Sequence, residues 1–151
     1  MDRKFLYIAE SYSYLNVIAM MFGSKGHHVD IASDFDSAKK ALEAKRYDTI
    51  FIEPYGLFSP LNTLSAKNRI ITNPHPEFYG RMILTDIILK EDSLNHDIST
   101  SIILESCKLP SDPYSEESYL KRGATKVMYK LSCNMDSLYQ ELLGMIELQV
   151  Y

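Results

Sequence analysis

The chain has few residues that could cross-link it, hold a metal ion or anchor it in a membrane. Its two cysteines, Cys107 and Cys133, lack metal-site spacing, so we expect reduced thiols. No stretch approaches the roughly 18 apolar residues of a membrane helix. The first apolar run, residues 5–9, is shorter than the roughly 7–15 residues of a secretory signal. These features predict a cytoplasmic protein that does not enter a membrane.

Positive charge is also scarce and scattered. The 151 residues include 16 Lys and Arg against 20 Asp and Glu, which gives a formal net charge of −4. The longest basic groupings are pairs, Lys39-Lys40 and Lys121-Arg122. Nucleic-acid binding draws on clustered Lys and Arg, so we expect no nucleic-acid partner.

Length and apolar patterning predict a single α/β domain over residues 1–151. Short apolar runs are typical of strands that are buried on both faces. Between these runs, apolar residues recur at helical spacing, and Ser33 or Asp34 can cap the second helix. Such alternation predicts a parallel sheet covered by helices. The first three strands are expected at residues 5–9, 29–32 and 48–52.

The remainder continues this alternation after an unusual loop at about 54–77. Gly, Pro and Asn punctuate residues 56–76, which favours loop over helix or strand. A loop of this length can cover a pocket, present a recognition surface or be a tolerated insertion, and the sequence leaves these alternatives open. The later elements are expected as helix 78–89, strand 101–104, helix 115–122, strand 125–129 and helix 136–148.

Three segments of this β/α frame carry a family resemblance. They are Phe5 to Glu10, Tyr47 to Glu53 and Lys121 to Lys130. In this order they resemble the receiver (CheY-like) domain of two-component response regulators. The resemblance implies a flavodoxin-like, doubly wound sheet of five parallel strands with helices on both faces. It also implies a site at the carboxyl ends of the strands, where open α/β sheets place their sites.

The acidic part of the family's site is changed in this chain. In the family, an aspartate accepts a phosphoryl group while acidic side chains hold Mg²⁺. The resemblance places Ala9 and Glu10 where the family has two acids, and Glu53 at the phospho-acceptor position. Glutamate is one methylene longer than aspartate, and positioning errors of about 1 Å can cost on the order of 10²-fold in rate.

The remaining site positions are partly retained. The family's hydroxyl residue falls on Ser106 or Glu105, and we prefer Ser106 because it keeps a hydroxyl. The family's lysine falls on Lys130. We expect Lys130 to pair with Glu53 and so fix one conformation without phosphorylation. The alternative is that Glu53 is a solvated carboxylate at the end of its strand.

A divalent cation is the weakest of these expectations. Carboxylates of Glu10, Glu53 and Glu105 are ligands of the kind Mg²⁺ accepts. We nevertheless expect a cluster of strand-end acids with weak affinity, hence no metal site and no cofactor.

Eleven tyrosines are too many to lie all in one core. Tyrosine is favoured at protein interfaces because its ring contributes contact area at low entropic cost. We expect some of them, including Tyr119 and Tyr139, to lie on the face formed by the last two helices. The family commonly dimerises there, which predicts a homodimer or a partner contact on that face.

The resulting functional prediction is a degenerate receiver, not an enzyme, that acts in signal transduction as a phosphorylation-independent interaction or scaffold module. A histidine kinase or an output protein is the kind of partner the resemblance implies. One alternative is a divergent receiver that still takes phosphate. The other is a small-molecule binder on the same flavodoxin-like fold.

Overall fold

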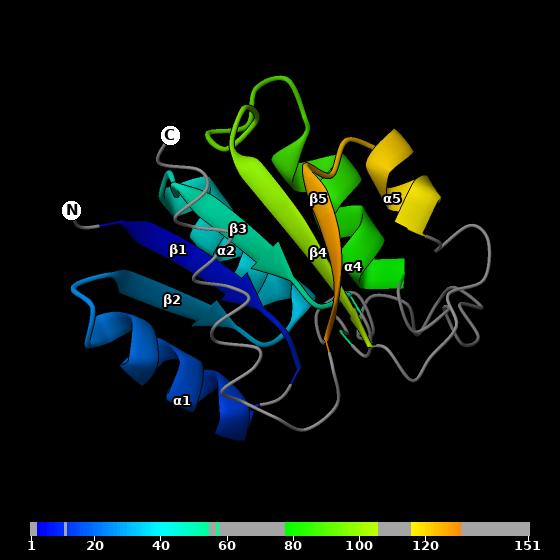
Figure 1. Cartoon of the computed structure of the whole chain (residues 1–151). Helices are drawn as coiled ribbons and strands as arrows, with labels where there is room; N and C mark the ends of the chain where they lie inside the picture. Colours follow the sequence, from blue (N-terminus) through cyan, green and yellow to red (C-terminus); the bar gives the residue numbers. More distant parts are fainter. Residues whose placement is uncertain (1–2, 11, 55–56, 58–77, 106–115, 131–151) are drawn as a thin grey trace, which may run out of the picture.

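The fold is a five-stranded parallel sheet with helices on both faces (Figure 1). The computed structural model describes residues 3–10, 12–54, 57, 78–105 and 116–130. The strand order is β2-β1-β3-β4-β5, the flavodoxin-like order, so the predicted fold class is confirmed. The strands are β1 (Lys4–Ile8), β2 (His28–Ala32), β3 (Thr49–Ile52), β4 (Ser99–Glu105) and β5 (Lys126–Lys130).

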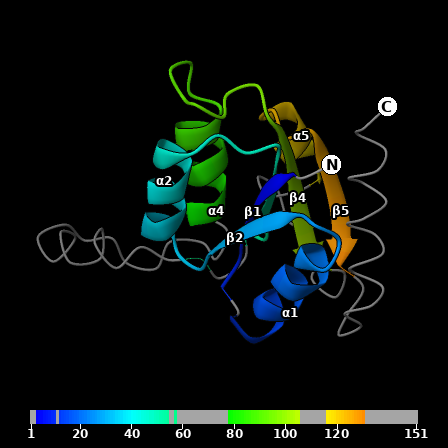
Figure 2. The same ribbon diagram turned by 90° about the vertical axis from the view of Figure 1, so that its left-hand side faces the viewer.

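Helices cover the sheet in two layers (Figures 1 and 2). One face carries α1, and the other carries α2, α4 and a π-helical segment, η2. The expected loop at about 54–77, apart from residues 54 and 57, and the expected helix over 136–148 lie outside the described residues. The described helical segments are α1 (Tyr12–Gly23), α2 (Phe35–Ala44), α4 (Phe78–Met82), η2 (Ile83–Ile88) and α5 (Glu116–Lys121).

The central strand β1 explains why this sheet has two cores. Successive side chains of a strand point to opposite faces. Leu6 and Ile8 therefore enter the core beneath α2 and η2, whereas Phe5 and Tyr7 enter the core beneath α1. All four are fully buried, so the strand shows a continuous apolar run instead of an alternating one.

Local signals set the ends of the first two helices. The chain leaves α1 through a turn in which Gly26 has φ 84°, a conformation that glycine adopts without strain. Asp34 caps α2: its carboxylate accepts a 2.7 Å hydrogen bond from the Ser37 backbone, and the Ser37 hydroxyl lies 3.3 Å from the Asp34 backbone nitrogen, which donates to it. This is the reciprocal capping box, and it confirms Asp34, one of the two predicted caps.

The helix expected over residues 78–89 changes its winding midway. The Leu89 backbone N–H donates to the carbonyl of Leu84, five residues back, at 3.0 Å. That spacing is the π-helical pattern. Within the same stretch, the Thr85 hydroxyl donates to the Arg81 carbonyl at 3.0 Å, which engages a helical acceptor from the side chain. Apolar periodicity predicted a helix here but could not distinguish α from π winding.

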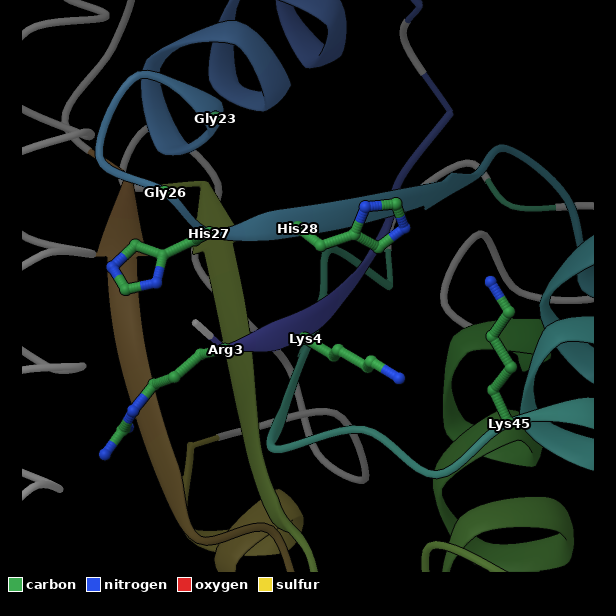
Figure 3. Close-up of a pocket in the computed structure, with 7 residues that line it drawn as sticks. All are labelled: Arg3, Lys4, Gly23, Gly26, His27, His28 and Lys45. Atoms are coloured by element: carbon green, nitrogen blue, oxygen red, sulfur yellow. The ribbon is translucent and has the colours of Figure 1, made fainter. Parts of the chain in front are cut away.

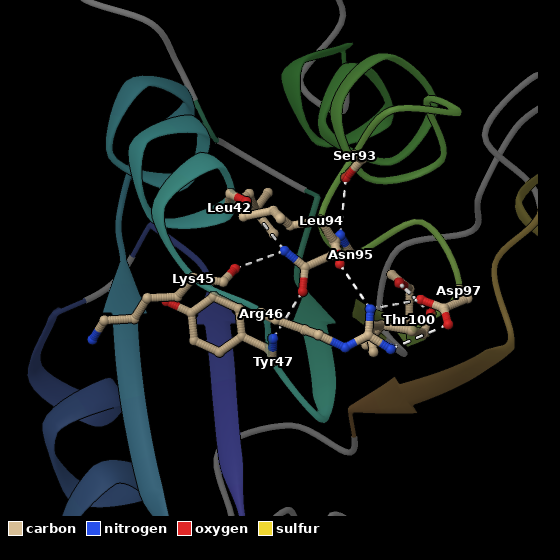
Figure 4. Close-up of polar contacts among 10 residues, drawn as sticks. Leu42, Lys45, Arg46, Tyr47, Ser93, Leu94, Asn95, Asp97 and Thr100 are labelled. Carbon is tan, nitrogen blue, oxygen red and sulfur yellow. Dashed lines mark hydrogen bonds and ion pairs between the residues drawn. The ribbon is translucent and has the colours of Figure 1, made fainter.

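Asn95 clamps the amino-terminal side of the sheet (Figure 4). Its side chain is fully buried and uses all of its bonding groups. The side-chain oxygen accepts from the Tyr47 backbone at 2.8 Å, and the nitrogen donates to the carbonyls of Leu42 and Lys45 at 3.1 and 2.9 Å. One residue of the loop before β4 therefore fixes the connection between α2 and β3.

Replacing Asn95 by alanine should lower stability markedly. The Asn95→Ala change leaves three backbone groups without their partner, and an unsatisfied buried group costs about 1–3 kcal/mol. We expect a loss of about 3 kcal/mol or more, which for this size lowers Tm by roughly 6–12 °C. Thermal unfolding followed by circular dichroism measures the shift.

Asp97→Asn is the matched control, since it weakens the neighbouring Arg46–Asp97 pair, whose side chains both stay largely in water. This control should melt close to the unmodified protein. Equal melting of the Asn95 and Asp97 variants would contradict the clamp.

Candidate functional site

The carboxyl ends of β1 and β3 bring Ala9, Glu10 and Glu53 to the same edge of the sheet. The Glu53 backbone N–H donates to the Ile8 carbonyl at 2.8 Å, which continues the pairing of β3 with β1. The Ala9 N–H donates to the Ala32 carbonyl at 3.0 Å on the other side. The backbones of Ala9 and Glu53 thus lie side by side, at the edge where this fold places its sites.

The Glu53 side chain turns inward and meets Tyr7. Glu53 is only 7% exposed, and the fully buried Tyr7 hydroxyl donates to its Oε2 at 2.8 Å. The strand period explains the meeting, since Tyr7 lies two residues before Ala9 and shares its face of the sheet. The Tyr7 ring also packs beside Phe51, with ring centroids 5.7 Å apart. The alternative of a solvated carboxylate at Glu53 is therefore wrong.

The Tyr7 hydroxyl is held in its protonated form. Burial raises its pKa well above the usual value for tyrosine, and the charge of Glu53 and their hydrogen bond raise it further. At physiological pH, Tyr7 is thus a permanent neutral donor to the carboxylate. The Tyr7 hydroxyl therefore gives the Glu53 carboxylate a hydrogen bond that stabilises its negative charge in the absence of a cation.

Ala9 makes room for this contact. Two residues of a strand span about 6.6 Å, close to the length of a tyrosine side chain, so a ring leaning along β1 reaches the level of residue 9. Ala9 is buried and presents only a methyl group there. A carboxylate at residue 9 would compete with the Tyr7 hydroxyl for the space beside Glu53.

The acidic side chains at this edge are the candidates for a Mg²⁺ site. Within them, no group of three or more His, Cys, Asp or Glu side chains is placed to hold a metal ion. Glu10 is exposed, and Glu53 is engaged by Tyr7. Glu10 and Glu53, the weak candidates from the sequence, therefore belong to no cluster of three or more such side chains among the described residues.

Other predicted site residues are only partly described. Lys130 lies on β5, where its Cα is registered with that of Glu105 on β4. The description includes these two backbones but not their side chains, and Ser106 lies outside the described residues. The pairing of Lys130 with Glu53 therefore stays a prediction, as does the choice of Ser106 for the hydroxyl position.

Sequence reasoning missed Tyr7 as a member of the site. It stands in the middle of an apolar strand, where a tyrosine is easily taken for ordinary core. The available signal was its position two residues before Ala9, on the same face of β1.

The interface role predicted for Tyr119 is contradicted by its burial. Its side chain is 1% exposed and belongs to the core beneath α2 and η2. The residue that α5 does expose is its neighbour Leu120, at 44%. A buried ring offers no area to a partner, so Tyr119 supports the core. Tyr139 lies outside the described residues.

A second, basic hollow lies at the opposite, amino-terminal end of the sheet (Figure 3). It has a volume of about 520 Å³. Arg3 and Lys4 point away from one another, so their charges do not converge. Its lining residues are Arg3, Lys4, Gly23, Gly26, His27, His28 and Lys45.

Asp30 engages two of the basic groups in this hollow. It accepts from Lys45 at 3.1 Å and lies 3.0 Å from His28, and Tyr47 donates to it at 2.8 Å. Partial burial raises the pKa of Asp30, but the hydrogen bonds and the Lys45 charge outweigh this and hold the pKa below its ordinary value. Asp30 therefore offsets part of the positive charge of the hollow, namely that of Lys45.

Comparison with known proteins finds relatives by structure alone. No family model and no curated protein matches the sequence. The chemotaxis protein CheY4 of Vibrio cholerae aligns with a TM-score of 0.65 at 15% identity, over 95% of this chain and 98% of that one. A CheY-like receiver domain protein from Methanospirillum hungatei aligns with a TM-score of 0.62 at 13% identity, over 99% and 97%. The chain has a receiver-type fold.

A third solved structure shows the site of this fold with its metal. The receiver domain of the sensor histidine kinase PA1611 from Pseudomonas aeruginosa aligns with a TM-score of 0.59 at 17% identity, over 94% of this chain and 95% of that one. Magnesium is coordinated in the active-site cleft of that protein. Likenesses at such identities establish the fold alone. Separately, no described helix of this chain is long and apolar enough to cross a membrane.

Removing the Tyr7 hydroxyl should change both the free energy of unfolding at neutral pH and its dependence on pH above about 10. At neutral pH, Tyr7→Phe removes a hydrogen bond to a charged group, for a loss of about 1.5–3 kcal/mol. In the unmodified protein, the raised pKa of Tyr7 means that the unfolded chain releases this proton first. Stability therefore falls as pH rises above about 10, by up to about 1.4 kcal/mol per pH unit from this group.

Phenylalanine cannot ionise, so the gap between the two proteins should narrow above about pH 10. Urea unfolding from neutral pH to pH 11 measures it. A gap that stays constant over this range would contradict the assignment of Tyr7 as the donor.

Proposed function

We propose that this chain is a receiver-like interaction module of signal transduction whose output does not depend on phosphorylation. The observation that carries the proposal is the buried hydrogen bond from Tyr7 to Glu53. It occupies the carboxylate at the edge of the sheet where the resemblance places the phospho-acceptor.

Three features of the site argue against efficient phosphoryl transfer. Ala9 provides no ligand where the family has an acid, and the charge that gathers in the reaction is ordinarily neutralised by a metal ion. Glu53 carries an extra methylene, which displaces its oxygens from the position of an aspartate. It is also only 7% exposed, and its Oε2 accepts the hydrogen bond from Tyr7, which makes that oxygen a weaker nucleophile.

The structural relatives show what the unaltered fold can do. A response regulator from Burkholderia pseudomallei was solved with a phosphorylated aspartic acid, and the PA1611 receiver with magnesium in its cleft. In this chain the buried Ala9 offers no ligand, and no cluster of three or more His, Cys, Asp or Glu side chains forms among the described residues, which supports the proposal. We therefore assign it no enzymatic step, and the signal would pass through a bound protein partner.

A thermal melt with Mg²⁺ plus beryllofluoride, a mimic of the acyl phosphate, tests the proposal. A ligand that binds only the folded state, at 100 times its Kd, stabilises by about 2.7 kcal/mol. For a domain of this size that raises Tm by roughly 5–10 °C. We expect no Mg²⁺-dependent shift for the unmodified chain.

A restored variant makes the absence of a shift interpretable. Tyr7→Val, Ala9→Asp and Glu53→Asp together remove the blocking hydroxyl and return the family's acids. If the natural residues Tyr7, Ala9 and Glu53 are what inactivates the pocket, this triple variant should gain a Mg²⁺-dependent rise in Tm of several degrees. A comparable shift in the unmodified chain would overturn the proposal in favour of a divergent, phosphorylatable receiver.

A further inference from the structure

A groove lies between α2 and η2. Both segments pack on the core opposite α1, and Figure 2 shows α2 on that face of the sheet. It has a volume of about 630 Å³. Its floor is apolar: Phe35 and Leu42 are almost fully buried, and Leu94 at one end is 49% exposed. Met82 and Ile87 complete the floor and pack against the core.

The rim of the groove is predominantly acidic. Four carboxylates line it against two ammonium groups, so negative charge is in excess by two. The buried residues of α2 are Phe35, Ala38 and Leu42. Each is followed directly by one of the rim residues of that helix. The rim consists of Asp36, Lys39, Glu43, Asp86, Lys90 and Asp92.

We propose that this groove docks a basic amphipathic helix of a partner protein. The apolar floor requires an apolar stripe, and the acidic rim requires cationic flanks. Helix-in-groove binding uses anchors at i, i+3 or i+4 and i+7, and the ten-residue helix α2 is about 15 Å long, or nearly three helical turns.

Charge selects this occupant over two others. A second copy of the chain docking symmetrically through the groove would place the same acidic rim against itself. A nucleic acid would bring phosphates to a surface with excess carboxylates. Only a cationic partner gains from the rim as well as the floor.

The inference deepens the proposed interaction role and rests on it, because it names where a partner binds and with what chemistry. The groove is built from α2 and η2, whereas the altered phospho-site is built from the ends of β1 and β3. The beryllofluoride melt and a groove-binding measurement can therefore fail independently of each other.

The test uses a fluorescein-labelled synthetic peptide of about 16 residues, long enough to form a helix when bound. Leucines occupy one helical face, and lysines flank them. Fluorescence anisotropy against the full chain should give saturable binding that weakens as salt is raised. The same peptide with glutamate in place of lysine should bind at least tenfold more weakly.

Two pairs of variants locate the binding. Glu43→Lys reverses a rim charge, and Glu117→Lys makes the same change on exposed α5. Leu94→Ser removes a half-exposed leucine in the groove, and Leu120→Ser removes one of similar exposure on α5. We expect each groove variant to weaken binding roughly fivefold or more, and each α5 variant to change it less than about twofold.

Equal affinity for the lysine and glutamate peptides would overturn the proposal. So would equal losses in the groove variants and their α5 controls, or saturable binding that none of the four substitutions changes. In those cases the peptide binds elsewhere or without regard to charge.

Discussion

Burial of β1 and β3 on both faces is the constraint on which the rest of this structure depends. A parallel sheet covered on both sides excludes water, so every polar group within it needs an internal partner. Glu53, turned into this environment, receives its hydrogen bond from Tyr7 instead of from solvent. The same constraint acts at the other end of the sheet, where the buried Asn95 side chain donates to the backbone carbonyls of Leu42 and Lys45 at the end of α2.

The frame of the fold could be predicted from the sequence, because alternating apolar runs and helical spacings leave few arrangements open. The π winding of η2 could not, since the turn from α to π depends on hydrogen bonds and not on periodicity. Tyr119 was misassigned because composition suggests how many tyrosines are exposed but not which. Only part of the site could be predicted. Glu53 could be placed because it follows the third strand, whereas Tyr7 could be recognised as its partner only once the carboxylate was seen to turn inward.

The two ends of the sheet are both fixed, but by different means. At the amino end, Asn95 and the Asp30 cluster join loops through hydrogen bonds to backbone and side chains. At the carboxyl end, one phenol holds one carboxylate.

The close approach of α4 to the end of β3 has a mechanical consequence. A methyl group added at Gly80 would lie 2.4 Å from the Cα of Pro54, so the helix rests directly on the residue that follows Glu53. No flexible side chain separates them to absorb a displacement. Any side chain larger than hydrogen at position 80 would therefore force α4 away from the end of β3. The missing side chain of Gly80 is thus what allows α4 to pack directly against Pro54, at close-packed density.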